Sequence, residues 1–107
     1  MKTFKLSESG HSGWFIGNFP KAVFQTEDFE VCYRTCAAGS RGDSHYHEKL
    51  TEVTLIASGK VLTNGQIYTA GDIYILEPNE ISQTEYLEET VVITIKTPSI
   101  PGDKVLV

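Results

Sequence analysis

The chain has 107 residues, of which 40% are hydrophobic and 21% are charged, and its formal net charge is −5 at pH 7. This length predicts one domain, and the apolar content is typical of a globular protein. The negative charge provides no basic patch for a nucleic acid or an anionic membrane. No run approaches the roughly 18 apolar residues of a membrane span, and the polar N-terminus lacks the apolar segment of a secretory signal. We therefore expect a cytoplasmic protein with no nucleic-acid or membrane partner.

Short segments rich in β-branched and aromatic residues follow one another along the chain, separated by turn residues. The predicted strands are 14–16, 21–26, 29–37, 43–47, 52–58, 60–63, 66–69, 73–76, 81–86 and 89–96. Asn64-Gly65 predicts a type I′ hairpin turn between two of them. Apolar residues nowhere recur with helical period for much more than one turn. The pattern predicts an all-β sandwich or barrel.

The two ends of the chain differ from this pattern. Residues 1–28 form a predicted arm, whose side chains Trp14, Phe15, Phe19 and Phe24 are too apolar to remain solvated. They either add an edge strand to the barrel or pack on a second subunit. Residues 29–96 are the predicted barrel core. Residues 97–107 contain two prolines and are predicted to run extended over the surface.

Cys32 and Cys36 lie four residues apart in one predicted strand. That spacing separates them by about 13 Å, whereas the Cα atoms of a disulfide lie within roughly 7 Å of each other. The same distance excludes a zinc site that uses both. We expect two reduced thiols packed on a sheet face, which suits a cytoplasmic protein.

A cluster of potential metal ligands lies near the middle of the sequence. His45 and His47 alternate along a predicted strand and so point to the same face. Glu52 follows a predicted turn over 48–51 and can return beside His47 from the next strand. Two neutral imidazoles and one carboxylate are the ligand set of non-haem iron sites and of catalytic zinc sites.

Two motifs around this cluster resemble those of the cupin family. The run Gly39-x5-His45-x-His47-x4-Glu52-x6-Gly59 matches the first cupin motif at every fixed position. Residues 71–82 resemble the second motif, and together the two cover 39 to about 86. The resemblance implies an all-β, antiparallel double-stranded β-helix, or jelly-roll barrel. It also implies a divalent-metal site within the barrel.

The second motif departs from the family at its metal ligand. Cupin sites usually hold three histidines and a glutamate, but the last histidine is Ser82 here, with Gln83 beside it. The motifs therefore supply only His45, His47 and Glu52. The third histidine of the chain, His11, lies in the arm and reaches the site only if the arm folds over the barrel mouth.

The missing ligand leaves three alternatives open. In the first, the metal remains, with water or Gln83 in the vacant position. In the second, no metal binds, and the histidines hold a small molecule or sugar, as in some metal-free sugar-processing cupins. In the third, the site is vestigial and the barrel is structural or regulatory.

For the first alternative, imidazole ligands predict Fe, Mn, Ni or Zn. Open coordination positions would suit a dioxygenase or an isomerase or lyase that acts on a small molecule. The metal-free alternative implies an epimerase or ketoisomerase-like enzyme, or a non-catalytic binding or sensor module. The sequence leaves open whether the protein is an enzyme. The resemblance also implies a homodimer, because small cupins often pair through sheet edges or exchanged N-terminal strands.

Polar residues on neighbouring strands are the further site candidates. Tyr74, Gln83 and Tyr86 are candidate catalytic residues, and Tyr33 and Arg34 are candidate substrate-binding residues. A guanidinium such as that of Arg34 or Arg41 can clamp a carboxylate or phosphate. Alternation from Glu52 predicts that Thr54 and Ile56 also point inward. Whether Tyr74 or its neighbours Ile73 and Ile75 face inward is not fixed by the sequence.

Overall fold

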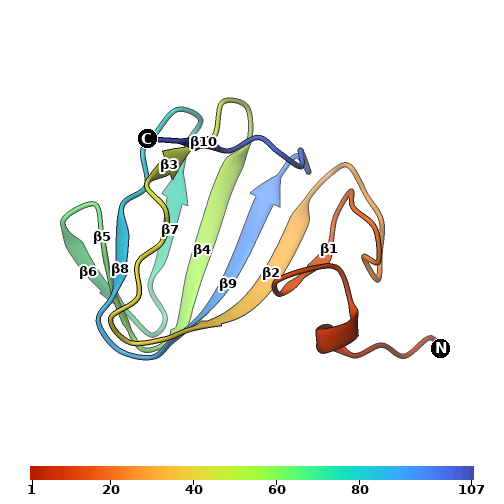
Figure 1. Ribbon diagram of the computed structural model, residues 1–107, viewed down its shortest axis with the longest axis horizontal. Helices are drawn as coiled ribbons and strands as arrows, with labels where there is room; N and C mark the ends of the chain where they lie inside the picture. The colour runs from red at the N-terminus through yellow and green to blue at the C-terminus, as the bar shows by residue number, and fades with distance from the viewer.

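The computed structural model describes residues 1–107 as two layers of antiparallel strands (Figure 1). One layer is a five-stranded sheet in the order β1-β2-β9-β4-β7, and the other consists of the smaller sheets β6-β5-β8 and β10-β3. Every strand pair is antiparallel, so the predicted all-β antiparallel fold is confirmed. No helix in the structure has the length and apolar character needed to cross a membrane.

The strands are β1 (Trp14–Ile16), β2 (Glu30–Cys36), β3 (His45–Tyr46), β4 (Thr51–Ser58), β5 (Lys60–Thr63), β6 (Gln66–Thr69), β7 (Ile73–Leu76), β8 (Thr84–Tyr86), β9 (Thr90–Thr97) and β10 (Val105–Leu106). One 3-10 turn, η1 (Leu6–Glu8), precedes β1. The predicted bounds of β1, β5, β6 and β7 are confirmed. The Asn64-Gly65 turn also forms, with both residues at positive φ between β5 and β6.

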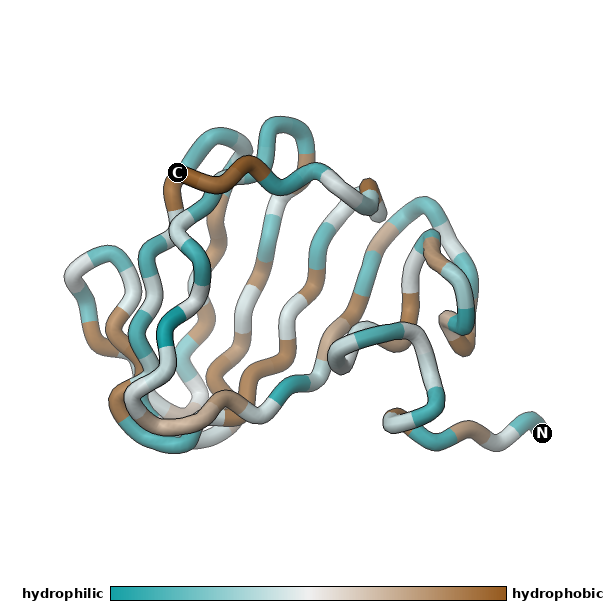
Figure 2. The backbone as a smooth tube through the Cα atoms, viewed as in Figure 1, coloured by the Kyte–Doolittle hydropathy of each residue, from teal (hydrophilic) through white to brown (hydrophobic).

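The closed end of the barrel contains the main apolar cluster. Its buried members are Cys36, Ile56, Val61, Tyr86 and Val92, from both layers. Burial alternates along β4, as the period of two requires, and Figure 2 shows hydrophobic residues interspersed with hydrophilic ones along the central strands. β3 and β10 lie at the opposite end of the barrel, which is called the open end below (Figure 1). The apolar core therefore stabilises one end and leaves the other free for polar groups.

The predicted strand at 21–26 is absent from the structure. Pro20 has no N–H to donate to a sheet, and Lys21 has a positive φ of 64°, so the extended run is broken before it begins. Only Phe24 forms an isolated bridge, with Ile16. The arm nevertheless contributes β1, which pairs with β2 at the edge of the large sheet. Of the two alternatives for the arm, the structure thus shows the edge strand.

The C-terminal tail was expected to run extended over the surface, and the structure adds where it lies. It crosses one end of the barrel, and Val105–Leu106 pairs with β3 as β10 (Figure 1). The Asp103 carboxylate accepts hydrogen bonds from the backbone N–H groups of Glu48, Lys49 and Leu50 at 3.0, 3.0 and 3.1 Å. The tail therefore fastens the turn between the metal-ligand candidates. The sequence could not show this, because the contacts join residues more than fifty positions apart.

Candidate metal centre

The three predicted metal ligands converge at the open end of the barrel. His45 lies on β3, His47 follows this strand directly, and Glu52 lies on β4. One potential ligand atom from each residue lies within 4.8 Å of the other two. His47 and Glu52 are buried, with 3% and 9% of their surface exposed, and His45 is half-buried. The cluster can therefore hold a metal ion.

Hydrogen bonds to the backbone orient both imidazole rings. Nδ1 of His45 donates to the carbonyl oxygen of Asp43 at 2.6 Å, and Nδ1 of His47 donates to the carbonyl oxygen of Asp103. A carbonyl oxygen only accepts, so each Nδ1 must carry the hydrogen. In a neutral ring this leaves Nε2 with a free lone pair. Such an arrangement of carbonyl and imidazole is typical of metal-ligating histidines.

The spacing of His47 and Glu52 suits a shared ion. Nε2 of His47 lies 3.3 Å from Oε1 of Glu52. Two ligand atoms that are each about 2.1 Å from one ion, at angles between octahedral and tetrahedral, lie roughly 3.0–3.4 Å apart. The residues present therefore fit a divalent metal. The His45 ring centroid lies 5.0 Å from that of His47 and completes one side of the site.

The electrostatics favour the protonation states that a metal requires. Burial raises the pKa of the Glu52 carboxyl, but the close contact with His47 and the charge of Lys96 bring that pKa below its usual value. Burial lowers the pKa of His45. Near neutral pH these shifts leave Glu52 ionised and His45 neutral, as ligands must be to bind a cation.

Ser82 occupies the motif position of the missing histidine ligand. Neither Gln83 nor His11 lies where it could replace that ligand. Ser82 is buried and lines the cavity, and its hydroxyl lies 3.4 Å from Oγ1 of Thr84. Gln83 points the other way, is exposed, and lines a separate, shallower pocket. The alternative that Gln83 fills the vacancy is therefore wrong, because alternation along the strand sends it outward. His11 reaches the cavity wall but packs edge-on against Phe19, outside the ligand cluster.

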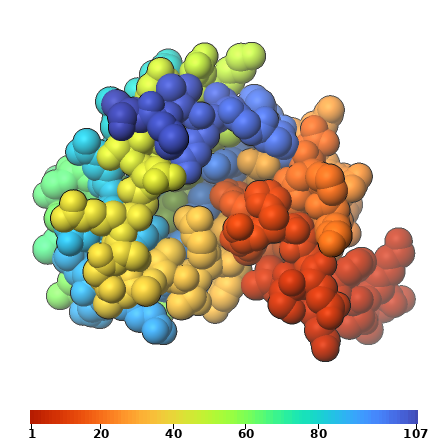
Figure 3. All heavy atoms as spheres, viewed as in Figure 1, coloured from red at the N-terminus to blue at the C-terminus, as the bar shows by residue number.

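A cavity of about 710 Å³ opens beside the cluster. Figure 3 shows the hollow between the N-terminal arm, the segment before β3 and the C-terminal tail. Among the candidate site residues from the sequence, Tyr74, Tyr86 and Arg34 line this cavity. Tyr33 does not, because it lies on the outer face of β2 with 43% of its surface exposed. Tyr74 faces inward while Ile73 and Ile75 are exposed, which resolves the register that the sequence left open.

The two cavity tyrosines are neutral phenols. Burial raises the pKa of Tyr74 and of Tyr86 above the usual value. Both can therefore donate a hydrogen bond to a ligand, but neither is a base near neutral pH.

Several polar residues that line the cavity were not predicted from the sequence. Glu30, Lys96 and Glu52 form one row across β2, β9 and β4, and Lys96 Nζ lies 4.7 Å from the centre of the Trp14 ring. Burial lowers the pKa of Lys96, and the charges of Glu52 and Glu30 oppose that shift. In the next row the hydroxyls of Thr54 and Thr94 lie 3.3 Å apart. Alternation predicted that Thr54 points inward, but the β4–β9 register needed to find its neighbours was not available from the sequence.

Comparison with known proteins identifies the fold. No protein-family model and no curated protein matches the sequence. Among solved structures, an uncharacterised conserved protein with a double-stranded β-helix domain from Klebsiella pneumoniae superposes with a TM-score of 0.72 at 21% identity, over 98% of this chain and 90% of that chain. An RmlC-like cupin from Shewanella frigidimarina gives a TM-score of 0.64 at 19% identity, over 71% of each chain.

A further similar structure is the DMSP lyase DddQ from Ruegeria pomeroyi. It gives a TM-score of 0.72 at 16% identity, and the match covers 97% of this chain but only 59% of the lyase. At these identities the likeness concerns the fold, and the fold hosts many activities. The chain is thus a small protein with the cupin fold, an antiparallel double-stranded β-helix.

Proposed function

We propose that this protein binds one divalent transition metal through His45, His47 and Glu52 and is a metal-dependent enzyme that acts on a small molecule in the adjoining cavity. One observation carries the proposal. Both imidazoles are fixed by Nδ1 hydrogen bonds to backbone carbonyls, which leaves Nε2 of each ring free to ligate, and one potential ligand atom from each histidine and from Glu52 lies within 4.8 Å of the other two. The ligand set suits Fe, Mn, Ni or Zn.

Among the possible reactions, we favour an isomerase or lyase over a dioxygenase. A metal with three protein ligands keeps open positions, at which it acts as a Lewis acid toward a substrate oxygen. The residues around the cluster suit proton transfer. Lys96 lies beside Glu52 in the cross-strand row, and Tyr74 supplies a neutral phenol from β7. Each can give a proton to a substrate or stabilise negative charge on it.

The similar structures are compatible with both reaction classes. They include the DMSP lyase DddQ and, at 12% identity and a TM-score of 0.58, a salicylate 1,2-dioxygenase from Pseudoaminobacter salicylatoxidans. The preference for proton chemistry therefore depends on Lys96 and Tyr74 of this chain.

Metal content tests the proposal. Protein purified without added metal should contain close to one equivalent of a transition metal by elemental analysis. The double variant His45→Ala, His47→Ala should lose it. His11→Ala is the matched control, because His11 lines the same cavity outside the cluster, and it should keep the full equivalent. The proposal would be excluded if wild-type protein contained no metal and if neither a chelator nor added metals changed its thermal stability.

A metal-free binding pocket is the second candidate, and one observation favours it. His47 and Glu52 already contact each other at 3.3 Å, and Ser82 stands where the family's last histidine is expected. A histidine held between two acceptors can be an imidazolium paired with the carboxylate. Thermal stabilisation by nucleotide sugars, with no response to metals, would favour this alternative.

We also propose that the protein is a homodimer, with the outer face of the five-stranded sheet as the contact. Two cross-strand rows on this face are almost entirely apolar. Their most exposed members are Tyr33, Ile73, Ile75 and Ile95. An outer sheet face is usually polar. A flat, uncharged patch is self-complementary about a two-fold axis, so we assign it to a second copy of this chain.

A further inference from the structure

Four lysine and arginine side chains line the cavity, and three of them face carboxylates of the protein. Arg41 forms an ion pair with Glu85 at 3.8 Å, and Lys104 forms one with Asp43 at 3.4 Å. Lys96 lies between Glu30 and Glu52 in its cross-strand row. The fourth is Arg34, which forms no ion pair and has no carboxylate in its cross-strand row, where it lies opposite Val92. It is the cation in this cavity whose charge no protein carboxylate balances.

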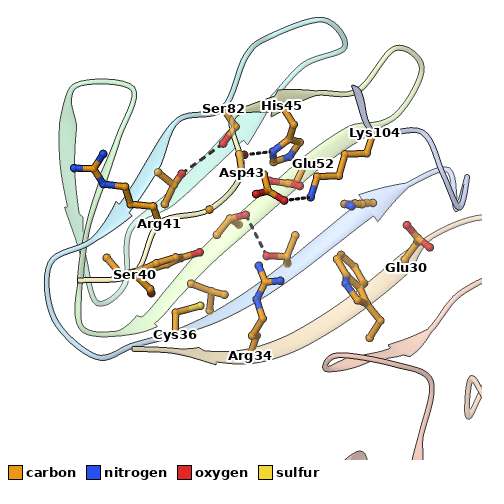
Figure 4. A pocket seen from close by; sticks show the side chains of 18 of the residues that line it. Glu30, Arg34, Cys36, Ser40, Arg41, Asp43, His45, Glu52, Ser82 and Lys104 are labelled. Atoms are coloured by element: carbon orange, nitrogen blue, oxygen red, sulfur yellow. Dashed lines mark hydrogen bonds and ion pairs between the residues drawn. The ribbon is translucent and has the colours of Figure 1, made fainter. Parts of the chain in front are cut away.

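The surroundings of Arg34 direct its charge toward the cavity. Its backbone lies opposite Val92 of β9, beside the apolar cluster at the closed end. Its guanidinium points from β2 into the cavity, toward Glu52 (Figure 4). Burial lowers the pKa of Arg34, but Cys32, Tyr86 and Cys36 together raise it above its usual value, and no carboxylate contributes. The N–H groups are therefore available to a molecule in the cavity.

A guanidinium in this position is a ready anion site. It stays charged at any physiological pH, and its planar fork of N–H donors matches the two oxygens of a carboxylate. Arg34 has no counter-ion in the protein, and a carboxylate bound in the cavity would supply one through a charge-assisted contact. The whole chain carries a net charge of −5, so an anionic ligand would find favourable potential only near such local cations.

The remaining charges of the cavity select a monoanion. Glu30, Asp43, Glu52 and Asp103 line the same cavity as Arg34. A phosphate dianion would meet roughly twice the repulsion that a carboxylate meets, with a single unpaired guanidinium to offset it. A carboxylate is satisfied by one bidentate contact. The charge pattern therefore favours a carboxylate over a phosphate.

The spacing of the rows limits the length of the ligand. The row that holds the Thr54–Thr94 hydroxyl pair separates the row of Arg34 from the row of Glu52. Successive rows on one face of a sheet are about 7 Å apart, and an arginine side chain spans about one of these intervals. A carboxylate on Arg34 thus lies roughly one row from the metal-ligand cluster. The two hydroxyls lie between, within reach of the middle of a short ligand.

We propose that Arg34 binds the carboxylate of the substrate, which makes the substrate a short carboxylic acid whose reacting group lies a few bonds from that carboxylate. This inference rests on the proposed function, since it places the reacting group at the His45–His47–Glu52 cluster. The Thr54 and Thr94 hydroxyls position the intervening atoms. Arg41 is already paired with Glu85 at 3.8 Å and has no such role.

Binding of simple acids to the full-length protein tests this inference. The probes are straight-chain monocarboxylates from acetate to hexanoate, the matching primary amides, and inorganic phosphate, measured by calorimetry or ligand NMR. Wild-type protein should bind at least one carboxylate at millimolar concentration, more tightly than its amide and than phosphate. Arg34→Gln should weaken carboxylate binding at least tenfold and leave amide binding unchanged. Arg34→Lys should recover part of the loss, and Arg41→Gln should change binding less than twofold.

Each outcome separates this inference from the proposed function. Metal content is measured on the same samples, and Arg34→Gln should keep the wild-type equivalent and a cooperative thermal transition. Carboxylate binding that survives Arg34→Gln, that Arg41→Gln removes, or that is absent from wild-type protein would overturn the role of Arg34 and leave the metal site standing. Tighter binding of phosphate than of any carboxylate would overturn the assigned ligand class. If wild-type protein contains no metal but binds a carboxylate, and Arg34→Gln loses that binding, only the proposed function is refuted.

Discussion

The two faces of the five-stranded sheet reverse the usual distribution of polarity. The inner face presents Glu52, Thr54 and Thr94 to the cavity, and all three are buried. The outer face, built by the residues between them, exposes Ile73 and Ile75 at 60% and 53%. Both faces come from the same strands, because successive side chains alternate. The outer residues supply strand propensity and an apolar surface, whereas the inner ones supply polar groups.

The inner face itself divides into an apolar end that stabilises the fold and a polar end. Only the closed end of the inner face carries a packed apolar cluster, around Ile56 and Val92. Toward the open end, burial is polar, and no buried side-chain nitrogen or oxygen lacks a hydrogen-bond partner. Buried polar groups stabilise little beyond satisfying one another. Their concentration at one end therefore points to a binding site rather than to a core.

The largest expected effect comes from breaking the apolar end. Ile56 has no exposed surface, so Ile56→Ala should leave a cavity and lower the free energy of unfolding by about 2–5 kcal/mol. Urea denaturation followed by circular dichroism measures the change. Ile75→Ala removes the same side chain from the outer face of the same sheet and should cost much less. Equal losses at the two positions would contradict the division of the sheet into a core face and an outer face.

The second effect concerns the tail that closes the polar end. Asp103→Ala removes the carboxylate that accepts three backbone N–H groups and should cost about 1–2 kcal/mol, as the loss of a helix cap does. Although burial opposes ionisation, these hydrogen bonds hold the pKa of Asp103 below its usual value of 3.8. The stabilisation is therefore complete above that pH and is lost as the pH falls through the lower pKa of the folded state.

Denaturation at a series of pH values checks this sign. The difference between wild type and Asp103→Ala should be constant near neutrality and should shrink in acid. Asp43→Ala is the matched control, because the Asp43 side chain makes only one partly exposed ion pair, with Lys104. It should change stability by less than about 0.5 kcal/mol. A difference for Asp103→Ala that grows as the pH falls would contradict the assignment.

A smaller effect sharpens the description of the polar rows. Thr54→Val leaves the Thr94 hydroxyl without its 3.3 Å partner and should cost about 1–2 kcal/mol. Changing both residues to valine removes both polar groups while keeping their shape, and should recover most of that loss. A double-mutant cycle measures the coupling. A double variant that is less stable than either single one would show that the hydroxyls have other essential partners.

The smallest effect on folding should come from the outer face. Ile75→Lys places a charge where 53% of the side chain is already exposed, so the monomer should change stability by no more than about 0.5 kcal/mol. Its solution mass should nevertheless fall from that of a dimer to that of one chain in light scattering. Wild-type protein with the mass of a single chain would refute the proposed dimer.

The sequence predicted what depends on local pattern. Spacing placed His45, His47 and Glu52 in one cluster, and turn residues fixed the bounds of β5, β6 and β7. The sequence could not predict the register between strands that are far apart in the chain. Lys96 reaches the Glu52 row only because β9 pairs with β4 in one register, and Asp103 reaches the cluster only because the tail crosses the barrel. Gln83 was misplaced because neither face of the strand around 82–86 is marked by composition.

Anomalous diffraction from crystals of protein purified without added metal tests the central claim most directly. We expect a single strong peak about 2.0–2.3 Å from Nε2 of His45, Nε2 of His47 and a carboxylate oxygen of Glu52, with further coordination positions open to the cavity. A map with no peak at this point, in which His47 and Glu52 contact each other directly, would contradict it.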